Sequence, residues 1–257
     1  MQHIRLWRPP NLSGLLTRWH TDMQTYLRLC QTSGFIPHTF LPMQLFARLV
    51  VRLWVFVQVG NVKIVGMERL NHPGPVIFVP NHSSMFDALV MYIILKRWAR
   101  YMTAVEMMRG LGGLPGLVLS SLGCFAVDRK NGTAVLDPAI KVVASGQDMV
   151  IFAEGKINSF ALLMRFKSGP ARIALGAARQ SGQRVTLMPV HICFGKRDPY
   201  TAAIDNYLCM GLKWRGHVTI TVLPPVHIEP DVAASEEVFT ARVRQSIADC
   251  PCATALK

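Results

Sequence analysis

His82 and Asp87 are the first residues of this sequence that could do chemistry together, in the run NHSSMFD (81–87). On a straight helix, residues five positions apart point about 140° away from each other, so one helix cannot bring both side chains together. They can meet if His82 lies in a turn and Asp87 near the start of the following helix, which Ser83 or Ser84 would cap. An aspartate that holds one imidazole nitrogen leaves the other free to act as a general base. The spacing alone also fits a capping aspartate and an unrelated surface histidine.

Two further runs place charged side chains just after short apolar stretches. The run GCFAVDR (123–129) ends in Asp128 and Arg129, and the planar guanidinium of Arg129 suits a phosphate group. The run FAEGKINS (152–159) brings Glu154 into a glycine turn, and the basic run RFKSG (165–169) follows it before a predicted helix. Together these residues could form an anion cradle. A surface ion pair at 128–129 and an ordinary loop at 152–169 are the alternative interpretations.

The elements that must position these residues follow an α/β pattern beyond residue 62. Short apolar runs predict buried strands at 76–80, 124–127, 149–153, 185–190 and 218–223. Segments of helical composition lie between and after them, at 87–96, 170–179 and 235–247. Most of the polar residues above follow a predicted strand, and ligand sites in open α/β sheets collect at strand ends. We expect one α/β domain over residues 63–257, with a single mixed sheet flanked by helices.

Residues 1–62 differ in character and are predicted to be a basic, amphipathic region that attaches the protein to a membrane. The stretch 42–59 is apolar apart from four polar side chains, Gln44, Arg48, Arg52 and Gln58. The first three are spaced by four residues and form one stripe on a helix. A transmembrane helix needs about 20 apolar residues without such charges. An interfacial helix instead combines a basic stripe with aromatic side chains on its other face, here Phe46, Trp54 and Phe56. A buried helix of a soluble core, with two partly covered arginines, is the alternative.

The composition indicates an anionic partner. The chain is 51% apolar and 17% charged, which excludes a disordered chain or an acidic tail, and its formal net charge is +13. The partner could be nucleic acid, an anionic lipid surface or a phosphorylated substrate. The positive mean hydropathy of +0.27 favours the lipid surface. Nucleic acid is disfavoured because no helix-turn-helix, zinc-finger or RNP-like signature accompanies the charge.

The six cysteines indicate reduced thiols in a cytosolic compartment rather than a metal site. They are Cys30, Cys124, Cys193, Cys209, Cys250 and Cys252, and none of them forms a CxxC pair. Cys250 and Cys252 have no histidine or cysteine at a finger-like spacing, so we expect no zinc. We expect no signal peptide at the start of this sequence, because arginines and prolines interrupt residues 1–15.

Taken in order, these runs resemble the motifs of the glycerolipid acyltransferase family. Its members move a fatty acyl group from acyl-CoA or acyl carrier protein to a hydroxyl of a lysophospholipid. The NHx4D motif is matched by Asn81, His82 and Asp87. The glycine-to-aspartate-arginine strand is matched by Gly123, Phe125, Asp128 and Arg129. The FPEG motif is matched by Phe152, Glu154 and Gly155, with Ala153 in place of the proline. The FKxG element is matched by Phe166, Lys167 and Gly169, and the final apolar strand by Met188, Pro189 and Val190. The resemblance covers residues 62–230.

The resemblance implies catalysis without an acyl-enzyme. His82, oriented by Asp87, would take the proton from the acceptor hydroxyl as that oxygen attacks the thioester carbonyl. The chain has no GxSxG run and so lacks the nucleophile signature of a serine hydrolase. Arg129 would hold the phosphate of the acceptor, and Glu154 would shape the acceptor site. The implied substrate-binding set is Asn81, Phe125, Asp128, Arg129, Glu154, Gly155, Lys156, Lys167 and Pro189. No metal or cofactor is implied beyond the acyl donor as co-substrate.

Two departures from the family pattern bear on the substrate. Many members continue the third motif with threonine and arginine, where this chain has Lys156 and Ile157. A lysine is a point charge rather than a fork, so we expect phosphate recognition to be looser or tuned to another headgroup. This variant is similar to that of tafazzin-type remodelling acyltransferases. Many relatives also carry a lysine where Val105 precedes Glu106, so other groups, such as backbone N–H groups, must stabilise the thioester oxyanion.

We therefore expect a membrane-associated O-acyltransferase on the cytoplasmic face, most simply one that converts lysophosphatidic acid to phosphatidic acid in phospholipid biosynthesis. Its expected partners are a lysophospholipid acceptor, an acyl-CoA or acyl carrier protein donor and an anionic membrane surface, with no nucleic acid. A remodelling acyltransferase or transacylase with another headgroup is one alternative, favoured by Lys156 and Ile157. A non-catalytic membrane-binding relative is another, against which the intact spacing of His82 and Asp87 argues. The apolar segment 111–122 could line an acyl-chain tunnel, dip into the membrane or form a core helix.

Overall fold

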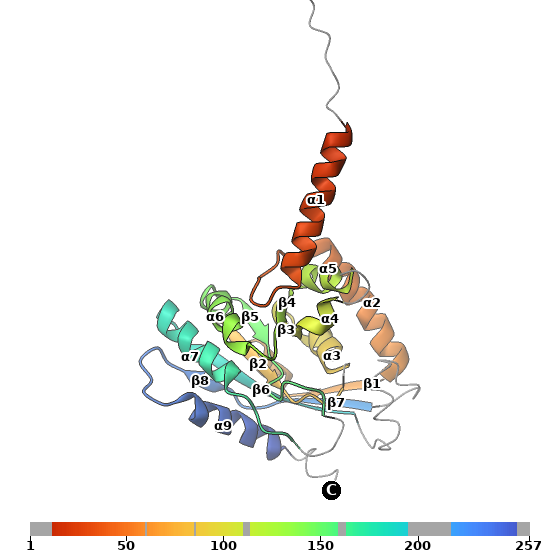
Figure 1. The fold of residues 1–257 in the computed structure, drawn as a ribbon. Coiled ribbons are helices and arrows are strands. Elements are labelled where there is room, and N and C mark those ends of the chain that lie inside the picture. The colour runs from red at the N-terminus through yellow and green to blue at the C-terminus, as the bar shows by residue number, and fades with distance from the viewer. Residues whose placement is uncertain are drawn as a thin grey trace, which may run out of the picture.

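The computed structural model describes residues 12–59, 61–84, 86–109, 114–158, 163–194 and 217–250 (Figure 1). Several parts singled out from the sequence lie outside these described residues: 1–11, 111–113, Ser159, Cys209, Cys252 and the rest of 251–257. Within the described residues, the strands form one eight-stranded sheet in the order β1-β7-β6-β2-β5-β3-β4, with β8 paired to β6.

The sheet is mixed, as the sequence predicts. Its strands are β1 (Asn61–Val65), β2 (Val76–Pro80), β3 (Ala99–Ala104), β4 (Cys124–Val127), β5 (Asp148–Val150), β6 (Val185–Cys193), β7 (His217–Val222) and β8 (Val226–Ile228). Strands β6, β2, β5, β3 and β4 are parallel neighbours. Strands β7 and β8 run antiparallel to β6, and β1 is parallel to β7. The central strand β2 is buried along its whole length because neighbouring strands and covering helices enclose it, which explains its unbroken apolar run.

Helices cover both faces of this sheet (Figure 1). On one face lie α2 (Leu41–Val59), α3 (Phe86–Ile94), α4 (Val105–Arg109) and α5 (Leu114–Ser121), and α1 (Leu12–Cys30) precedes them in the chain. On the other lie α6 (Leu136–Ala144), α7 (Gly169–Ser181) and α9 (Glu236–Ala248). The described residues also include two short 3₁₀ helices, η1 (Met67–Leu70) and η3 (Gly132–Val135). Each face has its own apolar core: Val76 and Phe78 of β2 contribute to one, Ile77 and Val79 to the other.

Helix α2 packs on the rest of the protein with the first two side chains of its polar stripe, Gln44 and Arg48, turned inward, whereas the third, Arg52, is exposed. Gln44 is buried and its Nε2 donates to the carbonyl of Leu122 at 3.2 Å. The guanidinium of Arg48 lies 3.8 Å from the ring centroid of Trp98, and its Nη2 donates to the carbonyl of Leu95 at 3.1 Å. Gln44 and Arg48 therefore both find partners inside the protein. The sequence pattern shows only that their stripe lies opposite the apolar side of the helix.

The outward face of α2 is apolar. Its exposed apolar side chains are Leu41, Leu45, Phe46, Leu49, Val50, Leu53, Phe56 and Val57. Trp54 is not among them, because its ring stacks on Phe86 of α3 at 4.8 Å between centroids, so its predicted place beside Phe46 and Phe56 was wrong. The alternative of a helix buried in a soluble core is also wrong for α2. No helix in the described part of the chain combines the length and apolar character needed to cross a membrane.

The boundary predicted at residue 62 falls within β1, one residue after that strand begins at Asn61. Helices α1 and α2 precede the sheet, and α1 points away from it (Figure 1). The division into an attachment region and a catalytic domain stays a prediction. Of the apolar segment 111–122, the described part forms α5, in which Gly116 and Ser120 are buried and Leu114 and Val118 are exposed.

Candidate active site

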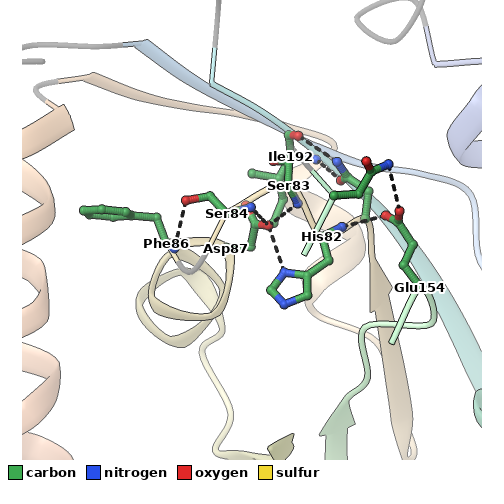
Figure 2. A network of polar contacts seen from close by, with 9 residues as sticks. His82, Ser83, Ser84, Phe86, Asp87, Glu154 and Ile192 are labelled. Carbon is green, nitrogen blue, oxygen red and sulfur yellow. Dashed lines mark hydrogen bonds and ion pairs between the residues drawn. The ribbon is translucent and has the colours of Figure 1, made fainter. Parts of the chain in front are cut away.

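The predicted pair of His82 and Asp87 is formed. His82 follows the end of β2 in a turn, and Asp87 lies in the first turn of α3, as the spacing requires. The two side chains meet with His82 Nδ1 at 3.1 Å from Asp87 Oδ2 (Figure 2). Asp87 is fully buried, whereas the His82 side chain keeps 15% of its surface exposed. The imidazole thus lies against a buried carboxylate and remains open to solvent.

The Asp87 carboxylate is fixed by backbone donors. Its Oδ2 accepts the N–H of Ser83 at 2.6 Å and the N–H of Ser84 at 2.8 Å. Ser84 Oγ in turn accepts the N–H of Phe86 at 3.2 Å, so Ser84 caps the start of α3. Because an ionised carboxylate only accepts hydrogen bonds, Nδ1 of His82 carries the proton in this contact. Nε2 of His82 is then the nitrogen with a free lone pair.

Phe152 and Glu154 hold His82 from the loop that follows β5. The rings of His82 and Phe152 stack at 4.0 Å between centroids, with 26° between their planes. Glu154 Oε1 accepts the backbone N–H of His82 at 2.8 Å, and the N–H of Asn158 donates to the carbonyl of His82 at 2.7 Å (Figure 2). Ring and backbone of His82 are therefore both held by segment 152–158.

Glu154 bridges His82 to Asn158 and Met164, and it also lines the site. The residue is buried, with 5% of its surface exposed. Its Oε2 accepts the N–H of Met164 at 3.2 Å and lies 3.4 Å from Asn158 Nδ2. With Oε1 bound to His82, both oxygens of this carboxylate have protein donors, which compensates for its burial.

A cavity of about 850 Å³ lies beside this bridge. This volume is within the range of small-molecule sites, about 300–1,000 Å³. Five residues of the predicted substrate-binding set line it: Arg129, Glu154, Gly155, Lys156 and Lys167. They come from the loops after β4 and β5, and these parallel strands place their carboxyl ends at one edge of the sheet.

The cavity is cationic. Arg129, Lys156, Arg165 and Lys167 all line it, and none of the four forms an ion pair within the described residues. Arg244 adds a fifth positive charge, against the carboxylates of Glu154 and Glu237. Unpaired cations that converge on one cavity favour a phosphate-bearing ligand.

The other four predicted substrate residues lie in the framework around the cavity. Asn81 binds the backbone of Ile192, with Oδ1 accepting its N–H at 2.7 Å and Nδ2 donating to its carbonyl at 3.0 Å. Phe125 is fully buried in the core. Asp128 Oδ1 accepts the N–H of Lys130 at 2.8 Å. Pro189 lies within β6 opposite Val79. A contact with substrate stays a prediction for each of the four.

Sequence reasoning missed the part of the cavity wall contributed by α9. Glu237, Thr240, Ala241 and Arg244 line the cavity from this helix. Helix α9 itself is predictable, because Phe239, Val243 and Ile247 recur every four residues and are buried. Nothing in that pattern says that Thr240 and Arg244, one position further on, face a cavity formed by loops far away in the sequence. Arg165 had a signal, since it opens the basic run 165–169.

Gly155 leaves the space that Lys167 occupies. Gly155 has φ of +72°, and a Cβ built there would lie 2.9 Å from Lys167 Nζ. Gly155→Ala should therefore displace the Lys167 side chain, besides a backbone strain of about 1–2 kcal/mol. We expect a several-fold rise of the acceptor KM in acyl-transfer kinetics. Gly182→Ala is the matched control, because Gly182 has φ of +66° and open space at its Cβ position. Equal KM values in the two variants would contradict a role for the Lys167 position.

The family model described as Acyltransferase matches residues 61–193, just over half of the chain, and the protein belongs to this acyltransferase family. The family resemblance drawn from the motifs is confirmed at this level.

Among solved structures, the chain is similar to the 1-acyl-sn-glycerophosphate (LPA) acyltransferase PlsC from Thermotoga maritima. The TM-score is 0.57 at 21% sequence identity, over 80% of this chain and 75% of that chain. The similarity confirms the predicted fold, a single mixed α/β sheet flanked by helices.

Proposed function

We propose that this protein transfers a fatty acyl group from a thioester donor to the free hydroxyl of a lysophospholipid. The proposal is carried by the pair of His82 and Asp87, which lies beside a cavity lined by four unpaired cations. Glu154 connects the two, because it lines the cavity and binds the backbone of His82. A general base next to a phosphate site suits an acceptor that has both a hydroxyl and a phosphate. Membership of an acyltransferase family is consistent with this reaction.

The proposed reaction is a direct transfer. Nε2 of His82 takes the proton of the acceptor hydroxyl, and that oxygen bonds to the carbonyl carbon of the thioester. When the tetrahedral intermediate collapses, the carbon–sulfur bond breaks and the imidazolium returns its proton to the leaving sulfur. The products are an ester and a free thiol, and His82 is neutral again. Asp87 keeps the imidazole in the required tautomer and stabilises the imidazolium.

For the acceptor we propose a phosphate held by Arg129, Lys156 and Lys167. Lysophosphatidic acid is the simplest such acceptor, and the similar PlsC from Thermotoga maritima is an LPA acyltransferase. A lysophospholipid with a larger headgroup is the second candidate. It is favoured by Lys156, a point charge instead of a fork, and by the size of the cavity, about 850 Å³. We propose that acyl-CoA or acyl carrier protein is the donor and that no metal takes part.

We also propose that the protein works at the cytoplasmic surface of an anionic membrane. The support is the apolar outward face of α2, together with a formal net charge of +13. A helix with such a face is stable when the face lies in the interfacial region of a bilayer. The positive charge adds attraction to anionic lipids. An acceptor with an acyl chain would then be reached without leaving the membrane.

Arg129→Ala should raise the KM for the acceptor. Loss of a hydrogen bond to a charged group removes about 1.5–3 kcal/mol, which corresponds to a rise of about 10-fold or more. We expect kcat to change less, because His82 and Asp87 stay in place. Steady-state kinetics with varied acceptor measure the effect. Lys130→Ala is the control, since Lys130 is the neighbouring exposed cation and does not line the cavity. An unchanged acceptor KM in Arg129→Ala would remove this residue from the phosphate site.

The proposed function is tested by acyl transfer with the purified protein in liposomes. Labelled acyl-CoA and labelled acyl carrier protein are offered as donors to a panel of lysophospholipids. Transfer confined to lysophosphatidic acid supports the biosynthetic role, and preference for another headgroup supports a remodelling role. If neither donor transfers its acyl group to any acceptor of the panel, the proposal is contradicted.

A further inference from the structure

Arg244 lies outside the segment that the family model matches, yet it binds the backbone of Leu163 and Met164, next to Glu154. Phe239, Val243 and Ile247 bury one face of α9 against the sheet, which turns Arg244 toward segment 163–168. Its Nε donates to the carbonyl of Met164 at 3.0 Å, and its Nη2 donates to the carbonyl of Leu163 at 3.1 Å. The guanidinium fork thus binds two consecutive carbonyls with donors in a fixed planar geometry, which the flexible ammonium of a lysine does not provide.

One peptide unit connects Arg244 to the Glu154 bridge. The carbonyl of Leu163 accepts from Arg244, and the N–H of the same peptide, from Met164, donates to Glu154 Oε2 at 3.2 Å. Because a peptide unit is planar, holding its carbonyl also orients its N–H. A cation on the carbonyl side and a carboxylate on the N–H side polarise the peptide in the same sense, so the two contacts strengthen each other.

The other oxygen of the Glu154 carboxylate binds the turn that carries His82. Glu154 Oε1 accepts the backbone N–H of His82 at 2.8 Å (Figure 2). A continuous chain of contacts therefore runs from the guanidinium of Arg244 through the 163–164 peptide and Glu154 to the backbone of His82. Glu154 is buried, so loss of one donor on Oε2 is not readily replaced by water.

We propose that Arg244 is a positioning residue, which sets the place of His82 through the 163–164 peptide and Glu154. The proposal rests on the proposed function for its kinetic consequence, because it assumes that His82 is the general base. The contact chain itself does not depend on the reaction. Misplacement of a catalytic group by about 1 Å costs about 100-fold in rate, so even a small shift of His82 matters.

Kinetics of Arg244→Ala test the role of the contact chain. We expect kcat to fall by about 10-fold or more, with the acceptor KM changed by less than about threefold. Arg244→Lys, with one donor group in place of the fork, should be intermediate. In the double variant Arg244→Ala with Glu154→Ala, kcat should be no lower than in Glu154→Ala alone, because Arg244 acts through that carboxylate. Arg172→Ala is the control, because the Arg172 side chain ties α7 to Glu236 of α9 at 3.4 Å and does not line the cavity. Its kcat should stay at the wild-type value.

Amide hydrogen exchange gives a readout that needs no turnover. The N–H groups of His82 and Met164 both donate to Glu154, so Arg244→Ala should speed their exchange relative to wild type and to Arg172→Ala. Unchanged exchange at both amides would overturn the contact chain, whatever the enzyme does. A rise of acceptor KM alone would make Arg244 a substrate ligand instead, and fully additive losses of kcat in the double variant would show that it acts independently of Glu154. Absence of acyl transfer by the wild-type protein would contradict the proposed function. The exchange rates of the two amides would still test the contact chain from Arg244 to His82.

Discussion

His82→Ala is expected to lower kcat for acyl transfer by about 100- to 10,000-fold, the usual contribution of a positioned general base. Without Nε2, the acceptor hydroxyl attacks with its proton in place, and the leaving sulfur receives no proton from the enzyme. The fold should survive the change. The His82 side chain lies at the surface of the site, partly exposed, and its main apolar contact is the ring of Phe152.

The measurement is the initial rate of transfer in liposomes, with thermal unfolding measured on the same preparations. His72→Ala is the matched control, because His72 lies before β2 at the opposite end of the strand from His82. We expect this control to keep the wild-type rate. Turnover of His82→Ala within a few-fold of wild type would contradict the proposed mechanism, whatever the fate of the control.

A triple variant of the outward face of α2, Leu49→Ser with Leu53→Ser and Phe56→Ser, should release the protein from membranes. These side chains are 68%, 64% and 71% exposed, so the protein itself gains little from their apolar character. Burial of one such side chain away from water contributes about 1.5–3 kcal/mol. The loss of all three should therefore lower the partition coefficient by about 1,000-fold or more.

Binding to vesicles of phosphatidylcholine and phosphatidylglycerol, measured by co-sedimentation, tests this prediction. The matched control changes three exposed apolar residues elsewhere on the surface, Val65, Met67 and Val238, to serine. This control should bind as the wild type does. Equal binding of all three proteins would show that α2 is not the membrane-contacting face. Higher salt should weaken wild-type binding only in part, since screening affects attraction to anionic lipid and leaves apolar burial in place.

The pairing of His82 with Asp87 was predictable because it is local. Five residues separate them, a strand delivers the first and a helix start holds the second, and turn chemistry with Ser84 leaves few other arrangements. The buried strands β2, β4 and β6 were predictable for a related reason, since a strand covered on both faces needs a continuous apolar run. Strand β5 was predicted only in part, because it ends at Val150 and not at 153. Strands β1, β3 and β8 were not predicted. Each is short or carries polar residues, and β8 has only three residues.

The direction of α2 could not be predicted from its periodicity. A spacing of four shows that Gln44 and Arg48 share a stripe, but it does not tell whether the stripe meets protein or solvent. Tertiary contacts decided this, because the carbonyls of Leu122 and Leu95 and the ring of Trp98 offer partners for these polar groups. Turning Gln44 and Arg48 inward leaves the apolar side outward, the reverse of a helix on a water-soluble core, and only Arg52 of the stripe stays exposed.

By itself, the sequence determined the order of apolar strands, the turn that joins His82 to Asp87 and the basic residues after β4 and β5. These features depend on neighbours within a few positions, where propensity and spacing act directly. Only the tertiary structure decided which of these residues share a cavity, and that Arg244 reaches the Glu154 bridge. Contacts between residues 80 positions apart depend on how helices pack on the sheet, and a hydrophobic pattern specifies which face is buried without specifying what it is buried against.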